Sequence, residues 1–224
     1  MTRPDASLAE FGSVIAPATR AVWPLVAQSA PPGGSLMGGT ALAVHLRHRV
    51  SRDLDLFSVE PFDHDVITER LRSAGASVER RSSGGASLDC VVDGVLVQFV
   101  HAPGQRILQE PTELAGMRIG SRADLCATKL GAIGGRAELR DYFDLMCLET
   151  LGGLNLADGF DCYLARYGLD SDHASVRHIL EALGYLDDVA EDPYLEQSAG
   201  TDVRRTVTSY WKRRQPELLR GLSI

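Results

Sequence analysis

Hydrophobic positions near the start of the chain follow the spacing of helices. Apolar residues three and four apart predict helices over residues 8–26 and 63–74, each with one face towards a core. Pro17 and Pro24 interrupt the first segment, so it predicts one kinked helix or two short ones. We expect the helices to lie on one side of a sheet.

Strands are predicted where apolar residues form short runs or alternate with polar ones. Five such segments lie at residues 35–37, 53–57, 77–81, 88–92 and 95–100. Asp93-Gly94 joins the last two and is the strongest hairpin signal in the chain. Together these segments predict a mixed sheet of four or five strands and an α/β (α+β) fold.

The segment Leu36–Phe57 carries most of the predicted chemistry. Two glycines, Gly38 and Gly39, end the first strand, and Leu42 and Leu46 then recur at helical spacing. A glycine turn that leads into a helix leaves backbone N–H groups unpaired, and such groups bind phosphate. The alternative is a turn without a ligand.

Asp53 and Asp55 flank Leu54 on the second predicted strand. Residues two apart on a strand point to the same face, so both carboxylates face one spot while Leu54 enters the core. Two carboxylates opposite a phosphate cradle form the ligand set of Mg²⁺ bound to a nucleoside triphosphate. The alternative is a solvent-exposed or capping pair.

Composition narrows the class of protein. The 224 residues, 44% hydrophobic and 24% charged, suit a soluble protein with one large domain, or a catalytic domain with a small helical part. No apolar run reaches the roughly 18 residues of a membrane span, and the N-terminus lacks a signal-peptide pattern, so we expect a cytoplasmic protein without membrane contacts. Cys90, Cys126, Cys147 and Cys162 are widely spaced, which favours buried thiols over zinc ligands or disulfides.

Charge is distributed unevenly. The net charge of −7 argues against a broadly basic nucleic-acid-binding protein. Yet residues 153–197 contain ten acidic residues and two arginines, whereas residues 198–224 contain six basic residues and two acidic ones. Either the two segments pack as charge-paired helices, or the basic residues form a stripe that faces nucleic acid. The basic residues are Arg204, Arg205, Lys212, Arg213, Arg214 and Arg220.

Two motifs follow each other in the segment that carries the chemistry. They are Gly38-Gly39-Thr40-Ala41-Leu42 and His48-Arg49-Val50-Ser51-Arg52-Asp53-Leu54-Asp55. They resemble motifs of the AbiEii/AbiGii toxin family of nucleotidyltransferases, within the DNA polymerase β-like superfamily. The resemblance implies transfer of a nucleoside monophosphate from an NTP, RNA such as a tRNA 3′ end as acceptor, and a toxin with a cognate antitoxin. The residues then expected to bind the nucleotide are Gly38, Gly39, Thr40, Arg49 and Arg52, with Asp53 and Asp55 holding Mg²⁺.

A later segment resembles the family's closing motif, in which a lysine-bearing helix is followed by an arginine and by Arg/Lys-Asp-x-x-Asp-Leu. Only two of the 23 basic residues are lysines, which suggests that a compact ammonium is needed at Lys129 as a point contact to a triphosphate, where it would neutralise the leaving pyrophosphate. The alternative is a surface lysine placed there by chance. Arg136 is a further candidate for nucleotide binding. Asp141 and Asp144 are neighbours on one helix face and need a cation between them, from Lys129, Arg136 or Arg140. Either aspartate could orient or deprotonate the attacking hydroxyl.

One position departs from the superfamily, which usually supplies a third metal-binding carboxylate from a strand beside the Asp-x-Asp strand. In register with that pattern this chain has Gln98, which is not an anionic ligand. The strand acid nearby is Asp89, which alternation with Leu88 and Cys90 places on the outward face. The departure calls into question the form of the mechanism that uses two metal ions.

We therefore predict a mixed-sheet, polymerase β-like nucleotidyltransferase core with N-terminal helices over residues 1–120, and a helical part over residues 121–224. The alternative enzyme is a small-molecule nucleotidyltransferase acting on a cationic acceptor such as an aminoglycoside, which the acidic segment favours. The alternative class is a degenerate nucleotide-binding module, which Gln98 favours.

Overall fold

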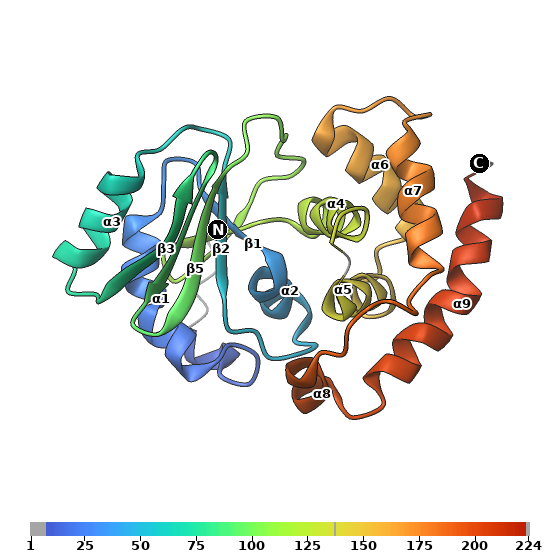
Figure 1. Cartoon of the computed structure of the whole chain (residues 1–224), viewed down its shortest axis with the longest axis horizontal. Coiled ribbons are helices and arrows are strands. Elements are labelled where there is room, and N and C mark those ends of the chain that lie inside the picture. The colour runs from blue at the N-terminus through green and yellow to red at the C-terminus, as the bar shows by residue number, and fades with distance from the viewer. Residues whose placement is uncertain (1–7, 137, 223–224) are drawn as a thin grey trace, which may run out of the picture. The chain divides into compact units, whose positions relative to one another are not determined.

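The computed structural model describes residues 8–136 and 138–222 of a chain that divides into two compact units (Figure 1). Unit 1 consists of residues 1–105 and 109–121, and unit 2 of residues 106–108 and 122–224. Among the helices of the described residues, none combines the length and hydrophobicity that a membrane crossing requires.

In the described part of unit 1 the central element is a seven-stranded mixed sheet with the order β3-β4-β5-β2-β1-β7-β6. The strands are β1 (Ser35–Met37), β2 (Leu54–Ser58), β3 (Val78–Gly84), β4 (Ser87–Val92), β5 (Val95–His101), β6 (Thr112–Leu114) and β7 (Met117–Ile119). The prediction of a mixed sheet is confirmed, but the predicted number of four or five strands is wrong. β6 and β7 have three residues each, too few to show an alternating pattern.

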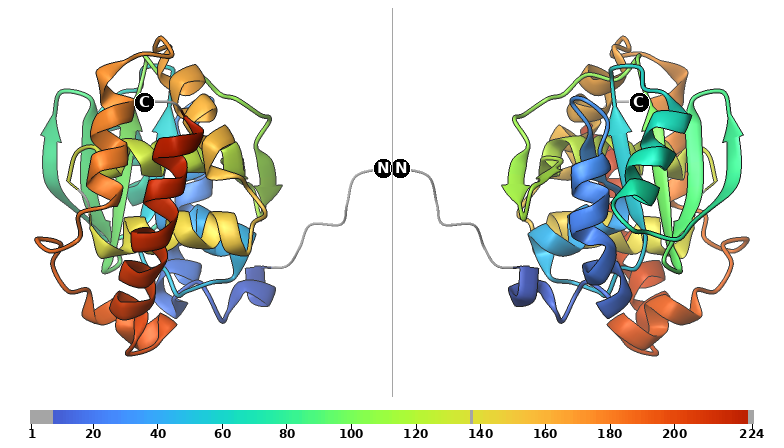
Figure 2. Two further views of the ribbon diagram at one scale, coloured as in Figure 1. Left: turned by 90° about the vertical axis from the view of Figure 1, so that its right-hand side faces the viewer. Right: turned by 90° about the vertical axis from the view of Figure 1, so that its left-hand side faces the viewer.

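The N-terminal segment forms a 3₁₀ turn (Leu8–Phe11) and the helix α1 (Pro17–Ser29), which is the second of the two predicted forms. The predicted interruption at Pro24 is wrong, because α1 continues through this residue. Pro17 is the first residue of α1, where the missing N–H needs no partner. α1 and α3 (His64–Ser73) lie side by side on one face of the sheet (Figure 2). α2 (Gly38–Leu46) follows β1 directly.

β4 and β5 form the predicted hairpin. Asp93 and Gly94 have φ angles of +46° and +86°, in the left-handed region that this two-residue turn requires. A turn of fixed length sets the register of the two strands. The register places Asp89 of β4 opposite Gln98 of β5.

Unit 2 is helical. Its helices are α4 (Arg122–Ile133), α5 (Leu139–Thr150), α6 (Leu156–Tyr167), α7 (Ala174–Leu183), α8 (Pro193–Ala199) and α9 (Val203–Gly221). α4 packs against α6, and α5 packs against α9. Trp211 of α9 is fully buried, and its indole N–H donates a 3.2 Å hydrogen bond to the carbonyl of Tyr142 on α5. The contact anchors the last helix in the core of the unit.

The cysteines are free thiols. Cys90, Cys126 and Cys147 are buried, as predicted, whereas Cys162 is half-buried. Burial raises the pKa of the Cys90 thiol to about 11, and it also raises the pKa of Cys126. Both thiols are therefore protonated at neutral pH and behave as small apolar side chains.

Candidate active site

The glycine turn at Gly38-Gly39 lies between β1 and α2, so the predicted order of strand, glycine turn and helix is confirmed. Gly38 has a φ of +64°, a conformation that favours glycine. A Cβ atom at Gly38 would lie 2.2 Å from Oδ2 of Asp55, and one at Gly39 would lie 2.2 Å from a terminal nitrogen of Arg49. Both positions need glycine because charged side chains lie against the turn.

The start of α2 is hydrogen-bonded to the segment before β2. Its N-cap residue is Met37, whose side chain has no oxygen to accept hydrogen bonds from the first turn. The hydroxyl of Thr40 lies 2.5 Å from the carbonyl oxygen of Asp53 and 2.7 Å from Oγ of Ser51. Because a carbonyl can only accept, Thr40 donates to Asp53 and accepts from Ser51. The Thr40 hydroxyl therefore positions the turn relative to the acidic residues.

Asp53 directly precedes β2, and Asp55 lies within it. Leu54 and Leu56 are fully buried, as predicted for Leu54, whereas both aspartates are half-buried. Side chains alternate along a strand, so Asp55 lies on the face opposite these leucines. On this face the Asp55 carboxylate lies against the backbone of Gly38.

A row of polar side chains continues from Asp55 across the sheet. Asp55 pairs with Gln98 of β5, and Gln98 pairs with Asp89 of β4, so all three share one face. Gln98 Nε2 donates a 2.7 Å hydrogen bond to Asp89 Oδ1. Leu88 and Cys90 are buried, which confirms the predicted outward position of Asp89. The hairpin turn was the sequence signal that could have revealed this pair.

The basic residues between α2 and β2 have different surroundings. The guanidinium carbon of Arg47 lies 4.6 Å from the centre of the Phe11 ring. Arg49 is buried and lies against Gly39, whereas Arg52 is exposed. Arg49 is therefore the arginine that the structure places beside the glycine turn.

In unit 2, Lys129 of α4 and the aspartates Asp141 and Asp144 of α5 meet in a buried group, here called the Lys129 cluster. Lys129 Nζ lies 2.7 Å from Oδ1 of Asp141 and 2.8 Å from Oδ2 of Asp144. The three side chains are 9%, 1% and 0% exposed. The expected cation between the carboxylates is therefore Lys129. Asp141 also accepts a 3.2 Å hydrogen bond from the backbone N–H of Glu138 at the start of α5, where the helix dipole favours negative charge.

The arginines near this cluster contact a different residue. Arg136 is exposed and lies 3.9 Å from Glu138, and Arg140 also forms an ion pair with Glu138. The structure adds a buried ion pair that the sequence did not predict, in which Arg166 lies 2.5 Å from Asp124. These two residues are 42 positions apart, so no local pattern pointed to them.

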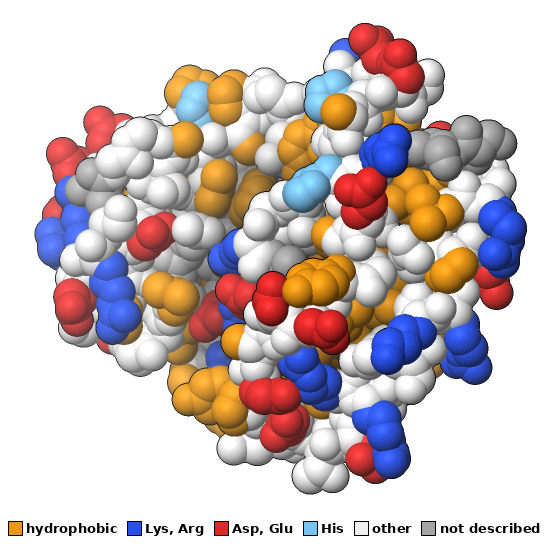
Figure 3. Space-filling view, turned by 45° about the vertical axis from the view of Figure 1, so that its right-hand side comes forward, with side chains coloured by type: hydrophobic (Ala, Val, Ile, Leu, Met, Phe, Trp, Pro, Cys, Tyr) orange, Lys and Arg blue, Asp and Glu red, His pale blue; other side chains and the backbone are white. Residues whose placement is uncertain are grey.

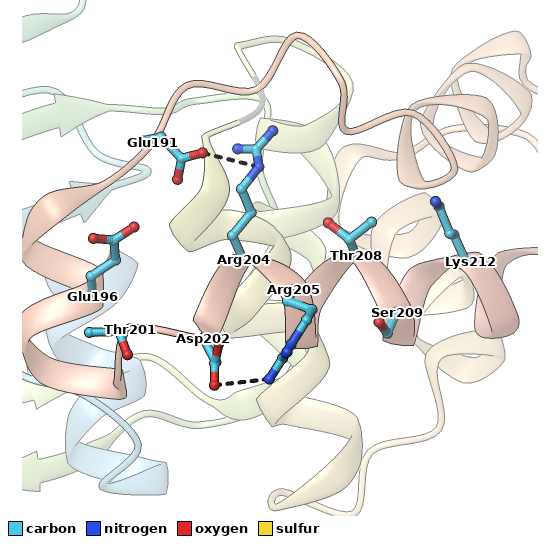
Figure 4. A pocket seen from close by; sticks show the side chains of 9 residues that line it. All are labelled: Glu191, Glu196, Thr201, Asp202, Arg204, Arg205, Thr208, Ser209 and Lys212. Carbon is cyan, nitrogen blue, oxygen red and sulfur yellow. Dashed lines mark ion pairs between the residues drawn. The ribbon is translucent and has the colours of Figure 1, made fainter.

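The basic residues of the C-terminal segment lie on α9, and some of them are held by carboxylates. The pairs are Arg204 with Glu191 at 3.2 Å, Arg205 with Asp202 at 2.9 Å, and Arg214 with Glu149 at 2.7 Å. The first two line a surface pocket of about 560 Å³ (Figure 4). Charge pairing between the acidic and basic segments is thus confirmed for Arg204, whereas Arg214 pairs with α5.

α9 also presents basic residues to solvent. Its buried residues are Val203, Val207, Trp211 and Leu218. The opposite side, here called the basic face of α9, consists of Arg205, Ser209, Lys212, Arg213, Pro216 and Arg220, and most of these residues are three or four positions apart. The right-hand part of Figure 3 shows several separate Lys and Arg side chains on the surface.

The mixed sheet, with a glycine turn against the carboxylate of its neighbouring strand, belongs to the class of nucleotidyltransferase folds. A candidate nucleotidyltransferase from Helicobacter pylori shares the fold with a TM-score of 0.56 and 20% identity, over 91% of this chain and 92% of that one. JHP933 from Helicobacter pylori has a TM-score of 0.50 and 18% identity, over 92% and 97%.

The family is established by the sequence match. The family described as nucleotidyl transferase AbiEii toxin, type IV toxin–antitoxin system, matches residues 35–223. The chain belongs to this family, and the predicted resemblance is confirmed. A relative from Aquifex aeolicus (strain VF5), the uncharacterized protein aq_aa25, is 26% identical over 163 residues, which are 71% of this chain and 76% of that protein.

Proposed function

We propose that this toxin-family nucleotidyltransferase transfers a nucleoside monophosphate from an NTP to a hydroxyl group of RNA, such as a tRNA 3′ end. The glycine turn supports this most directly, because Asp55 and Arg49 lie against Gly38 and Gly39. A triphosphate bound at the turn therefore meets both a cation and a metal-binding carboxylate. The acceptor oxygen forms a bond to the α-phosphorus, and the bond from that phosphorus to pyrophosphate breaks. Family membership supports a role as the toxin of a pair with a cognate antitoxin.

The carboxylates of unit 1 fit Mg²⁺. Asp53 and Asp55 offer anionic oxygen atoms, and Mg²⁺ is commonly held by one or two carboxylates together with phosphates and water. The described residues contain no group of three His, Cys, Asp or Glu side chains arranged for a metal, so the nucleotide would complete the coordination. When bound, Mg²⁺ offsets the charge of the triphosphate and polarises the α-phosphate.

We assign the Lys129 cluster to the same reaction. Lys129 offsets the negative charge that develops on the leaving pyrophosphate. Asp141 and Asp144 are 1% and 0% exposed and hold the ammonium in position, so the predicted contact of either aspartate with the attacking hydroxyl does not fit their burial. The ion pairs of 2.7 and 2.8 Å support a fixed position for the ammonium, because they restrict a long side chain to one conformation.

The reaction is tested with each labelled NTP in turn, with Mg²⁺ and either total tRNA or aminoglycosides as acceptors. Asp53→Ala and Asp55→Ala should each lower transfer by on the order of 10²-fold. Their melting temperatures should change little, because neither side chain is buried in the core. Glu113→Ala is the matched control, since Glu113 is an exposed carboxylate on β6 of the same sheet. Near-normal transfer by either aspartate variant would contradict the metal assignment, and no labelling of any acceptor would contradict the reaction.

The basic face of α9 supports RNA as the acceptor despite the net charge of −7. From Arg205 to Arg220 it extends for about 22 Å, since a helix rises about 1.5 Å per residue. Most of its side chains are basic or hydroxyl groups, although the exposed Glu217 lies next to it and Arg205 is paired with Asp202. The centre of a protein–protein interface is instead rich in aromatic residues. Such a face suits the phosphates of an RNA backbone.

Salt and charge reversal test the RNA assignment. Binding should weaken with salt, with a slope of log K against log[salt] of about −0.7 per phosphate neutralised. The double variant Lys212→Glu/Arg213→Glu should lower RNA labelling and leave binding of the NTP unchanged. Arg214 is unsuitable for this test because it holds Glu149. RNA labelling that does not depend on salt would contradict the assignment.

A small cationic acceptor is the second candidate. Asp187 and Asp188 are exposed in the acidic segment and would attract an aminoglycoside. In that case Asp187→Asn/Asp188→Asn should lower transfer to the aminoglycoside, and the α9 variants should have no effect. The two sets of variants therefore distinguish the acceptors.

A further inference from the structure

We infer that Gln98 supplies a neutral oxygen ligand to the metal site of Asp53 and Asp55, and that Asp89 orients Gln98 for this purpose. The inference rests on the proposed Mg²⁺-dependent function. Gln98 occupies the position at which the superfamily usually has a third metal-binding carboxylate. Register places Gln98 directly between Asp55 on β2 and Asp89 on β4.

The hydrogen bond between Gln98 and Asp89 determines which end of the amide faces the metal site. An ionised carboxylate can only accept, so the nitrogen of the Gln98 amide must point to Asp89, as the 2.7 Å contact from Nε2 to Oδ1 shows. The oxygen and nitrogen of an amide diverge from the same carbon. Because Asp89 binds Nε2, Oε1 is the amide atom of Gln98 that remains for a ligand. The strand on the other side of β5 is β2, where Asp55 is the register partner of Gln98.

Asp89 is too distant to be a ligand of the same ion. Neighbouring strands are about 4.8 Å apart, so Asp89 and Asp55 are separated by roughly 10 Å across β5. Magnesium binds oxygen at about 2.1 Å. Asp89 therefore acts through Gln98: it holds the amide in one orientation, and its charge polarises the amide so that Oε1 becomes a better donor of electrons. Asp89 is in this sense a positioning residue.

Direct binding of Mn²⁺ in place of Mg²⁺, followed by the electron paramagnetic resonance signal of the free ion, tests the inference without an activity assay. Gln98→Ala and Asp89→Ala should each weaken Mn²⁺ binding by on the order of 10-fold. Glu79→Ala is the matched control, because Glu79 is an exposed carboxylate on the neighbouring strand β3. Thermal melting checks that each variant folds.

An exchange of the two side chains provides the sharper test. In Asp89→Asn/Gln98→Glu the new amide at position 89 donates to the new carboxylate at position 98, so the hydrogen bond and the total charge are kept while the charge moves next to Asp55. This variant should bind Mn²⁺ more tightly than the parent, by on the order of 10-fold, because an anionic ligand replaces a neutral one. Gln98→Glu alone should gain less, because the carboxylate introduced at position 98 would then repel Asp89.

The outcomes separate this inference from the proposed function. If Asp53→Ala abolishes Mn²⁺ binding while Gln98→Ala and the exchange variant bind like the parent, the inference is wrong and the metal site stands. If Gln98→Ala weakens binding and Asp89→Ala does not, the role of Asp89 is wrong. If Asp53→Ala binds like the parent, the metal site of the proposed function fails, and the inference fails with it.

Discussion

Removal of the buried ammonium tests the Lys129 cluster most directly. Lys129→Met keeps the length of the side chain but takes away the charge that lies 2.7 and 2.8 Å from the carboxylates of Asp141 and Asp144. These carboxylates are 1% and 0% exposed, so water cannot replace the ammonium. Removal of one partner from a buried ion pair costs about 3–5 kcal/mol. A protein of this size loses about 2–4 °C per kcal/mol, so the melting temperature should fall by about 6–20 °C.

Urea denaturation at pH 7 measures the loss, and two further variants interpret it. Lys212→Met replaces the second lysine of the chain, which is exposed, and should change the free energy of unfolding by less than about 0.5 kcal/mol. The triple variant Lys129→Met/Asp141→Asn/Asp144→Asn should recover most of the lost stability, because it leaves no charge buried in the Lys129 cluster. It should nevertheless remain inactive if the charges serve the reaction.

Two results would refute the reasoning. One is a Lys129→Met protein as stable as the wild type, and the other is a triple variant less stable than Lys129→Met. Lys129→Arg should recover only part of the activity, because a forked guanidinium cannot occupy the place of one ammonium between Asp141 and Asp144. Full activity of the arginine variant would remove the argument for a compact cation.

Two other positions give independent predictions. Gly38→Ala should lower transfer by on the order of 10²-fold, because the new Cβ would lie 2.2 Å from Oδ2 of Asp55 and displace it. Gly85→Ala is its control, with a φ of +63° and nothing within 4 Å, so equal activity losses would contradict the role of the contact. Burial raises the pKa of Glu149, but hydrogen bonds from Arg214, Tyr210 and the backbone N–H of Leu156, with the charge of Arg214, together outweigh burial and lower it. The pKa of Glu149 is thus lower in the folded state than in the unfolded state, where it is about 4.3. The stabilisation is therefore present at a pH above the pKa of the unfolded state, and it is lost as the pH falls through the pKa of the folded state. Glu149→Gln should therefore cost about 1–3 kcal/mol in urea denaturation at pH 7 and much less near pH 3, and a cost independent of pH would contradict this.

Local sequence determined the part of the site that is made by a continuous stretch of chain. The strand, glycine turn and helix around Gly38, and the burial of Leu54, follow from residue types within a few positions of each other. Asp93-Gly94 likewise specified a two-residue turn, and the length of that turn fixes the pairing of Asp89 with Gln98. These features depend on backbone geometry and on side-chain period, both of which the sequence carries directly.

The sequence pattern did not reveal β6 and β7, although it predicted β1, which is equally short but ends at two glycines. β6 and β7 have three residues each and are joined by Ala115-Gly116, whose φ angles are +47° and +76°. In a segment of three residues, an alternation of apolar and polar side chains cannot be distinguished from chance. Their pairing depends on β1, because Leu36 of β1 is the partner of Ile119 of β7. The sheet was therefore larger than the sequence predicted.

Only the tertiary structure decided which charged residues are buried and which face solvent. Asp141 and Asp144, three positions apart, have the same spacing as any acidic pair on a solvated helix, and the packing of α5 against α4 placed them around Lys129. Arg213 and Arg214 are adjacent in sequence, yet one is exposed and the other holds Glu149. A helix turns by about 100° per residue, so neighbouring side chains face different surroundings, and only the packing of whole helices determines what those surroundings are.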